Sequence, residues 1–250
     1  MKLKMRWVVG LLTVGLLAGC SSSKPESQQT ATVSQSRLQL GLEYLNQGDL
    51  KAAQQNLEKA RDAAPDDYRT QLGMALYQQR VGDNQAAQES YQKAMNLAPQ
   101  NGTVMNNYGA FLCSLGQYVP AQQQFSSAAN LPDYGQVADS FENAGYCFLK
   151  AGQTEEARKL FSRALKSDPD KGVSLIAEAI REFDQGKRGD ARIMLDVYNH
   201  ILPASANSLW LQIRFAALDG RQTNLERYGK QLARNFPQSQ QYQQFLANEY

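Results

Sequence analysis

Small and large apolar residues return along residues 34–237 at the same positions of successive windows. When each window is numbered from its first residue, the first five have glycine or alanine at position 8, alanine at position 20, and leucine, tyrosine or phenylalanine at position 24. Small residues are expected where two paired helices approach most closely, and a large residue fills the remaining space between them. The pattern therefore predicts one helical pair per window, with starts at residues 34, 68, 102, 138, 172 and 206.

Glycine and proline mark the boundaries of these helices. A glycine recurs at position 15 of every window with spacings of 34, 34, 36, 34 and 34 residues, and in most windows a proline follows 17 residues later. Glycine lets the chain turn tightly between two helices, and proline ends the second helix before the next pair begins. A period of 34 residues is typical of tetratricopeptide (TPR) repeats. We therefore predict an all-α fold: a right-handed superhelical solenoid of six TPR helix-turn-helix repeats over residues 34–237, with a C-terminal capping helix over residues 238–250.

The sixth window departs from the pattern, with Leu225 at position 20 and Gly229 at position 24. Terminal units of a solenoid often drift because one of their faces lacks a neighbour. In the segment that follows, the spacing of Tyr242, Phe245 and Leu246 gives one apolar face if the segment is helical. We expect this helix to cover the open end of the sixth repeat.

One step in the array is longer than the others. The third and fourth windows are 36 residues apart, and the two additional residues fall within residues 130–136. Insertions in repeat proteins are found in loops, and Pro132 and Gly135 both favour turns. We expect a loop that projects from the edge of the solenoid, with the insertion either neutral or functional.

The first twenty residues indicate export. Three basic residues within residues 2–6 precede a short apolar run over residues 7–17, which is too short to span a membrane comfortably. The run ends in Leu-Ala-Gly before Cys20 and resembles a bacterial lipobox. In that class residues 1–19 would be removed as a signal peptide, and Cys20 would carry an N-acyl diacylglyceryl lipid. The alternative is an ordinary secretory signal with a chance cysteine.

The residues after Cys20 bear on localisation. Acyl chains hold a protein on a bilayer, because each buried methylene contributes about 0.8 kcal/mol. The residue after Cys20 is Ser21 and not an aspartate. By resemblance to other bacterial lipoproteins, this implies sorting to the outer membrane, with the protein facing the periplasm. Residues 20–33 are polar, and we predict a lipid-attached flexible tether there. No cofactor other than this covalent lipid is expected.

Charge and motifs narrow the possible functions. Without the three basic residues of the leader, 23 of the 26 basic residues remain against 24 acidic ones, which gives no electrostatic case for nucleic acid. The chain has one histidine and lacks the glycine-rich phosphate loops, H-E-x-x-H and C-x-x-C motifs. Cysteine and histidine are too few for a metal site of that kind. We therefore expect neither an enzyme nor a small-molecule substrate, and no metal.

Two internal cysteines lie on the first helices of the third and fourth windows. Cys113 is at position 12 of its window and Cys147 at position 10 of the next, so they differ by about half a turn in level. First helices of successive repeats pack side by side, and an exported protein meets an oxidising compartment. We expect a disulfide across the longer step; the alternative is two buried free thiols, which behave as small apolar residues.

Solenoids of this kind bind partners with their concave face, which is bordered by the first helix of each repeat. Apolar residues there would accept an amphipathic helix or an extended apolar peptide. Side-chain amides would donate hydrogen bonds to a peptide backbone and accept them from it, without needing a charged partner. Alternatively, the leucines pack in the core between helix pairs, and the amides are simply solvated on the first helices. The expected groove residues are Leu38, Leu42, Leu45, Leu72, Leu76, Asn106, Asn107, Asn143 and Tyr146.

A specific resemblance follows from the middle of the chain. Residues 106–113 read Asn-Asn-Tyr-Gly-Ala-Phe-Leu-Cys, and residues 143–147 read Asn-Ala-Gly-Tyr-Cys. Together with the lipobox, the tether and the six repeats, they resemble the type IV pilus biogenesis and stability lipoproteins, which are TPR-containing secretin pilotins. The resemblance spans nearly the full chain. By this resemblance Cys20 carries the anchor, and Asn106, Asn107, Cys113, Asn143 and Cys147 match the family's run.

The resemblance implies a non-enzymatic role. The protein would bind outer-membrane secretin subunits of the pilus machinery, bring them to the outer membrane through its lipid, and promote their assembly into multimers for type IV pilus biogenesis. Its partners would be the secretin and the lipid bilayer. The alternative function is a lipidated TPR scaffold that regulates cell-wall or other envelope enzymes.

Overall fold

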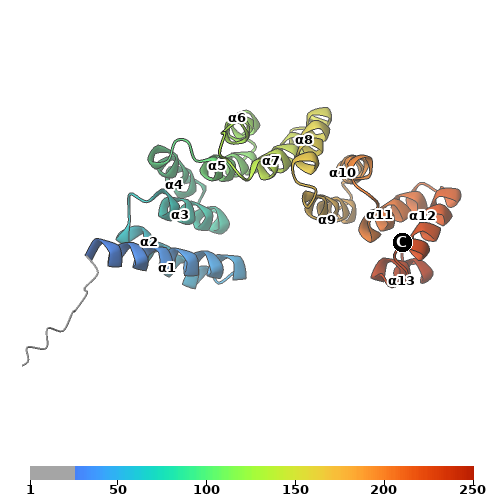
Figure 1. The fold of residues 1–250 in the computed structure, drawn as a ribbon, viewed down its shortest axis with the longest axis horizontal. Helices are drawn as coiled ribbons and strands as arrows, with labels where there is room; N and C mark the ends of the chain where they lie inside the picture. Colours follow the sequence, from blue (N-terminus) through green and yellow to red (C-terminus); the bar gives the residue numbers. More distant parts are fainter. Residues whose placement is uncertain (1–25) are drawn as a thin grey trace, which may run out of the picture.

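The computed structural model describes residues 26–250, and within this range the chain forms thirteen helices and no strand (Figure 1). The helices are α1 (Glu26–Gln47), α2 (Leu50–Ala63), α3 (Tyr68–Val81), α4 (Asn84–Leu97), α5 (Gly102–Ser114), α6 (Tyr118–Ala129), α7 (Val137–Lys150), α8 (Thr154–Ser167), α9 (Lys171–Asp184), α10 (Arg188–Ile201), α11 (Ala206–Leu218), α12 (Gln222–Asn235) and α13 (Gln240–Leu246).

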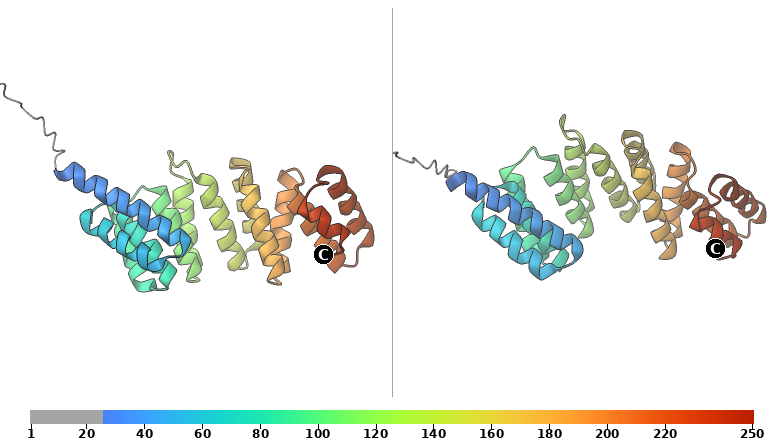
Figure 2. Two further views of the ribbon diagram at one scale, coloured as in Figure 1. Left: turned by 90° about the horizontal axis from the view of Figure 1, so that it is seen from below. Right: turned by 60° about the horizontal axis from the view of Figure 1, so that its bottom comes forward.

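The helices form six successive pairs that are stacked along an arch. Figure 1 shows α1 and α2 at one foot of the arch and α11 to α13 at the other, and Figure 2 shows the pairs side by side along the long axis. From α3 to α10, the first helix of each pair lies toward the inner side of the arch and the second helix toward the outer side. The predicted solenoid of helical pairs is therefore confirmed.

Each pair turns at the recurring glycine. The six glycines have φ values between 66° and 83°, a left-handed conformation that costs other residues about 1–2 kcal/mol. Gly82 shows how the turn is built, because it ends α3 and is followed at once by the cap of α4. The Asp83 side chain accepts a hydrogen bond from the backbone N–H of Ala86 at 3.1 Å, which satisfies a free donor at the start of that helix.

Small residues let the two helices of a pair approach. The large side chains at position 24 are buried, and Tyr91 and Phe161 have no exposed surface. A Cβ atom on Gly145 would lie 2.6 Å from the Phe161 ring, and one on Gly109 would lie 2.9 Å from the Phe125 ring. In these two pairs, glycine at position 8 is thus required by the aromatic ring that packs against it.

The core is divided among neighbouring pairs. One cluster joins Leu72, Tyr91 and Phe111, and another joins Phe161, Leu175 and other residues of the fourth to sixth pairs. Each pair therefore buries its apolar face against the next pair, as expected for a solenoid.

The first helix begins earlier than expected. Residues 26–33 were predicted to belong to the tether, but they form the first turns of α1. The segment from Glu26 to Thr32 has no glycine or proline to stop a helix. In addition, the buried Ser34 hydroxyl donates a hydrogen bond to the Ala60 carbonyl at 2.9 Å, which fixes this part of α1 on α2. The rest of the expected tether, the signal peptide and Cys20 lie outside the described residues.

The longer step between the third and fourth pairs forms a loop that folds back onto α5. The Tyr134 ring covers Gly102, where a Cβ atom would lie 2.4 Å from a ring carbon. The Gln136 side-chain oxygen accepts a hydrogen bond from the Thr103 hydroxyl at 3.2 Å. The loop therefore does not simply project, because its tyrosine uses the free space that glycine leaves at the start of α5.

The C-terminal helix is shorter than the expected segment over residues 238–250. Helix α13 ends at Leu246, and Tyr242 and Phe245 pack against the cluster formed by α11 and α12. Leu246 is 56% exposed, so the predicted apolar face is reduced to two residues. Among residues 26–250, no helix has the length and apolar character that crossing a membrane requires.

Candidate functional site

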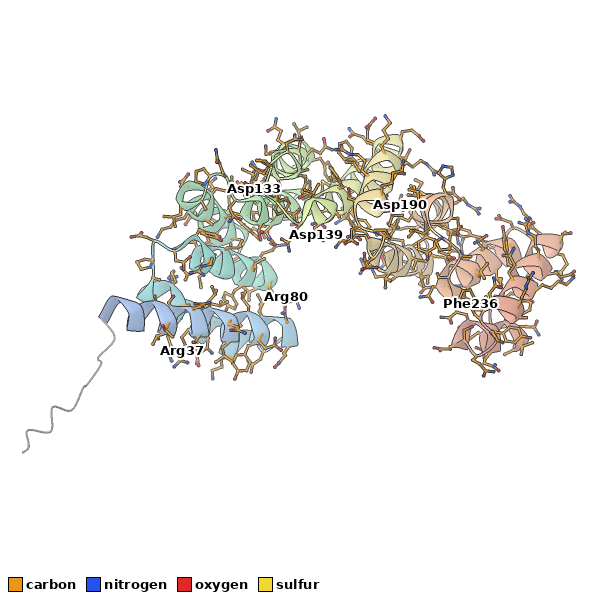
Figure 3. The ribbon with its side chains drawn as sticks, viewed as in Figure 1. Arg37, Arg80, Asp133, Asp139, Asp190 and Phe236 are labelled. Carbon is orange, nitrogen blue, oxygen red and sulfur yellow. A yellow bond between two sulfur atoms is a disulfide. The ribbon has the colours of Figure 1, made fainter. Side chains whose placement is uncertain are left out.

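The inner side of the first two pairs carries a groove of about 620 Å³. Leu42 and Leu45 of α1 and Leu76 of α3 supply its apolar surface. Figure 3 shows Arg80 on the inner side of the arch, at the end of α3. The same groove is lined by Asn46, Gln79 and Arg80, so apolar and hydrogen-bonding groups lie together there.

Two leucines that were expected in this groove lie in the core instead. Leu38 packs with Leu57, Ala60 and Met74, and Leu72 packs in the cluster around Tyr91. They are 8% and 9% exposed and do not line the groove, whereas Leu45, also 8% exposed, does line it. The stripe of leucines on a first helix is wider than the groove, so the side chains at its edge are covered by the neighbouring pair.

Two asparagines of the middle repeats, Asn106 and Asn143, hold α5 against α7. The Asn106 side-chain oxygen accepts hydrogen bonds from the Ser140 hydroxyl and from the Asn143 amide, each at 3.2 Å. Asn107 donates its amide to the Thr103 carbonyl of its own helix at 2.8 Å. Because Asn106 is only 9% exposed, its oxygen serves the contact between α5 and α7 and is not free for a partner. The expectation of Asn106 as a groove residue is therefore corrected.

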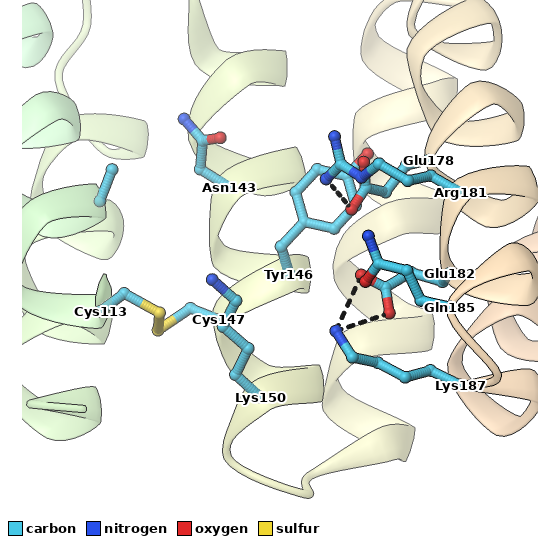
Figure 4. Close-up of a pocket in the computed structure, with 11 residues that line it drawn as sticks. Cys113, Asn143, Tyr146, Cys147, Lys150, Glu178, Arg181, Glu182, Gln185 and Lys187 are labelled. Atoms are coloured by element: carbon cyan, nitrogen blue, oxygen red, sulfur yellow. Dashed lines mark hydrogen bonds and ion pairs between the residues drawn. A yellow bond between two sulfur atoms is a disulfide. The ribbon is translucent and has the colours of Figure 1, made fainter. Parts of the chain in front are cut away.

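A second inner groove, of about 630 Å³, lies between α5, α7 and α9 (Figure 4). Asn143 and Tyr146, both expected from the sequence, line it from α7. The structure also joins Cys113 and Cys147 by a disulfide at the wall of this groove, with their Cα atoms 5.8 Å apart. The expected bridge thus spans α5 and α7, the two first helices on either side of the longer step.

Charged residues from the fifth repeat complete this groove, and sequence reasoning did not select them. Glu178 pairs with Arg181, and Glu182 pairs with Lys187 at 3.0 Å (Figure 4). Lys150 of α7 also lines the groove, and no carboxylate within residues 26–250 lies within ion-pair distance of it. The alternation of acidic and basic residues three and four apart on α9 was the available signal.

Polar and charged residues form the groove face of α9. Ile176, at position 5 of its window, is 3% exposed and belongs to the core, not to the groove. Residues 178, 181, 182 and 185 lie on the inner surface instead. Position 5 faces the core in the other windows as well, where Leu38, Leu72 and Trp210 are at most 9% exposed.

A polar cluster fixes α9 against α7 at the edge of this groove. Lys171 pairs with Asp139 and lies 3.5 Å from a Glu142 oxygen. The hydrogen bond to Asp139 raises the pKa of the Lys171 ammonium. Glu142 also accepts a hydrogen bond from the Tyr146 hydroxyl at 3.1 Å, and burial raises the pKa of that phenol. The cluster holds Tyr146 in place at the groove surface.

The arrangement is that of a protein-binding surface. The described residues contain no group of three or more His, Cys, Asp and Glu side chains that could hold a metal ion. The first inner groove offers an apolar surface with amides and one arginine, and the second offers a tyrosine, an amide and an unpaired lysine. Such surfaces recognise apolar and polar segments of another protein.

Comparison with known proteins agrees with this fold. Tetratricopeptide-repeat family models match residues 38–101 and residues 139–171. The chain is thus a TPR solenoid. No curated protein sequence matched it.

Two solved structures resemble the chain over nearly their whole length. PilF of Pseudomonas aeruginosa is 28% identical, with a TM-score of 0.61, over 88% of this chain and 99% of that one. PilW, described as a widely conserved type IV pilus biogenesis factor, is 29% identical, with a TM-score of 0.61, over 86% and 98%. Yeast Tom70 is 17% identical, with a TM-score of 0.61, over 90% of this chain and 48% of that one, and shares the fold alone.

Proposed function

We propose that this protein is a lipid-anchored TPR adaptor, a pilotin that binds secretin subunits and promotes their outer-membrane targeting and multimer assembly for type IV pilus biogenesis. The observation that carries the proposal is its likeness to PilF and PilW, which extends over 98–99% of those chains rather than over isolated repeats. The TPR fold alone would not indicate a function, since proteins with this repeat bind many unrelated partners.

The first inner groove is the proposed secretin-binding surface. Leu42, Leu45 and Leu76 form its apolar surface, while Gln79 and Arg80 supply hydrogen-bond donors at its edge. An amphipathic helix or an extended apolar segment of the secretin would bury its side chains against the three leucines. The second inner groove would then accept a more polar part of the partner.

Charge substitutions in the first groove test the proposal. Leu42→Asp with Leu76→Asp introduces two carboxylates where an apolar partner must be buried, so we expect secretin multimers to disappear from the outer membrane. Leu40→Asp is the matched control, because Leu40 is on the same helix, is 41% exposed, and does not line the groove. Unchanged multimers in the double variant, with its helical content and melting temperature retained, would refute secretin binding in this groove.

The lipid anchor is tested separately. We propose that Cys20 carries the N-acyl diacylglyceryl lipid and that the protein faces the periplasm from the outer membrane. Cys20→Ala should abolish incorporation of labelled palmitate and move the protein from the membrane to the soluble fraction. Retention of the label in this variant would rule out lipidation at Cys20. Deletion of this protein separates the two functions. If secretin multimers persist after the deletion, and cell-wall enzyme activity changes instead, the protein is an envelope-enzyme scaffold.

A further inference from the structure

A third groove opens on the outer side of the arch and is not part of the inner surface. It has a volume of about 500 Å³ and lies between α6 and α8, with α7 beneath. Its apolar lining comes from Val119, Phe125, Phe141, Ala144, Phe148 and Leu160. Helix α7 thus serves two surfaces, since Asn143, Tyr146 and Cys147 line the inner groove between α5, α7 and α9.

The wall formed by α6 differs from the other second helices. Residues 118–129 contain no Asp, Glu, Lys or Arg, whereas α2, α4, α8, α10 and α12 all carry charges. Val119 of α6 is 67% exposed at the groove. Charged residues are depleted from the centres of protein interfaces, and an uncharged helix beside an exposed apolar groove matches that composition.

The opposite wall carries one cation without a partner. The Arg163 guanidinium of α8 stacks over the Phe141 ring, with its central carbon 3.9 Å from the ring centroid. Lys159, on the same wall, is paired with Glu156 at 2.7 Å. Within residues 26–250, no carboxylate lies within ion-pair distance of Arg163. The groove therefore presents an apolar floor with a single oriented positive charge at its edge.

We propose that this outer groove binds an amphipathic helix of another protein, with apolar side chains at spacings of three and four residues and a carboxylate that pairs with Arg163. Helix α6 has twelve residues and is about 18 Å long, which matches a partner helix of about three turns. Buried apolar anchors in a groove are the usual basis of helix recognition, and Arg163, held over the Phe141 ring, would fix the direction of the partner helix.

A second copy of this chain would fill the groove poorly. Among the described helices, large apolar side chains exposed to solvent occur singly, except for Val33 and Leu40 on α1. These two are seven residues apart and cannot replace three or four successive anchors. The occupant is therefore another protein. The proposal is independent of secretin binding, because the proposed secretin-binding groove lies on α1 and α3, and the second inner groove lies on the other side of α7.

Site-specific photo-crosslinking in the native host tests this inference on the full chain. A benzoylphenylalanine at position 119 replaces a side chain that is already exposed, and the same residue at position 173, where Val173 is 75% exposed and outside the groove, is the control. We expect a crosslink to another protein from position 119 and none above background from position 173. Mass spectrometry should map the crosslink to a segment with the apolar spacing and the carboxylate described above.

Charge reversal at Arg163 supplies the second arm of the test. In Arg163→Glu the crosslink from position 119 should fall about tenfold, because a buried carboxylate of the partner would then face a like charge. An Arg in place of that carboxylate in the partner should restore it. A crosslink to a second copy of this chain, equal crosslinking from positions 119 and 173, absence of any crosslink, or indifference to Arg163→Glu in a folded variant would each overturn the proposal.

Discussion

At the scale of single residues, the pairing of glycine with an aromatic ring sets how closely two helices pack. Phe161 is fully buried, and its ring occupies the space that a side chain at Gly145 would need. Gly189 on α10 differs, because a Cβ atom there would meet nothing within 4 Å. The same substitution should therefore have opposite effects at these two glycines.

Gly145→Ala is expected to destabilise the protein, while Gly189→Ala is expected to stabilise it. In a helix interior, alanine is favoured over glycine by about 0.5–1 kcal/mol, and at Gly189, the second residue of α10, we expect a gain of up to this size. At position 145 the clash with Phe161 outweighs the gain, since overpacking costs about 1–3 kcal/mol. Urea unfolding of both variants measures the free energies of unfolding. Equal effects of the two substitutions would contradict the packing argument.

A second residue-scale prediction concerns the start of α3. The Asp67 carboxylate accepts a hydrogen bond from the backbone N–H of Arg69 at 2.9 Å and pairs with the Arg69 guanidinium, which lowers the pKa of Asp67. At neutral pH the pair stabilises the folded state. As the pH falls below the ordinary aspartate pKa of about 3.9, the unfolded chain takes up the proton first, so this stabilisation is lost.

Asp67→Asn keeps a residue that caps helices but removes the titration. We expect this variant to be less stable than the unmodified protein at pH 7 by up to about 1 kcal/mol, as for exposed ion pairs, and the difference to be smaller at pH 3. Chemical unfolding at the two pH values measures it. A difference that stays constant with pH would show that the carboxylate charge contributes nothing.

At the scale of elements, α7 organises the middle of the molecule. It is joined to α5 by the Cys113–Cys147 bridge and to α9 by the ion pair of Lys171 with Asp139. Its inner side lines one groove and its outer side the floor of another. The two neighbours are thus held by different chemistry, one covalent and one electrostatic, and only the covalent link responds to a reductant.

Loss of the bridge should therefore destabilise the central repeats. Cys113→Ala with Cys147→Ala opens a covalent loop of 34 residues, which is worth roughly 3–4 kcal/mol in the chain-entropy description. Thermal unfolding with and without reductant checks this, because the reductant should lower the melting temperature of the unmodified protein only. The mass of the unreduced protein should be lower than that of the reduced protein by two hydrogens. Two free thiols in the unreduced protein would contradict the bridge.

At the scale of the whole molecule, stability is distributed along the array. Each pair buries its core against its neighbours, so a defect at one end should not reach the middle. The C-terminal end depends on Phe245, whose ring lies over Gly229, where a Cβ atom would be 2.1 Å from a ring carbon. Leu246, the next residue, is 56% exposed and makes a useful comparison.

Phe245→Ala should loosen the last repeat alone. We expect hydrogen exchange of the amides of α11 and α12 to accelerate by about tenfold or more, because their cluster loses a packed aromatic ring. The amides of α5 to α8 should keep their rates. Leu246→Ala should leave both groups unchanged, and equal acceleration along the whole chain would show a single cooperative unit instead of a distributed one.

The repeat frame could be predicted from the sequence because it depends on local chemistry. Glycine at position 15 adopts the left-handed turn wherever it occurs, and small residues opposite large ones identify the helical pairs. The two cysteines were also visible, since neighbouring first helices bring them to adjacent positions. These features can be predicted from the order of residues in the chain and the period of the α-helix.

The division of apolar and polar residues between core and groove needed the tertiary structure. Leu42 lines a groove while Leu38, one turn earlier on the same stripe, is buried, because α2 and α3 cover Leu38 almost completely and Leu42 only in part. Asn106 was predicted to be a groove residue, but its side-chain oxygen accepts hydrogen bonds from Ser140 and Asn143 of the next repeat.

The sequence by itself therefore determined the solenoid, its period and the pairing of its helices, since these follow from residues close in the chain. Only the tertiary structure decided which faces stay open, including the charged groove face of α9 and the outer groove beside α6. The physical reason is that exposure depends on the angle and distance between successive pairs, and many weak contacts between repeats set these together.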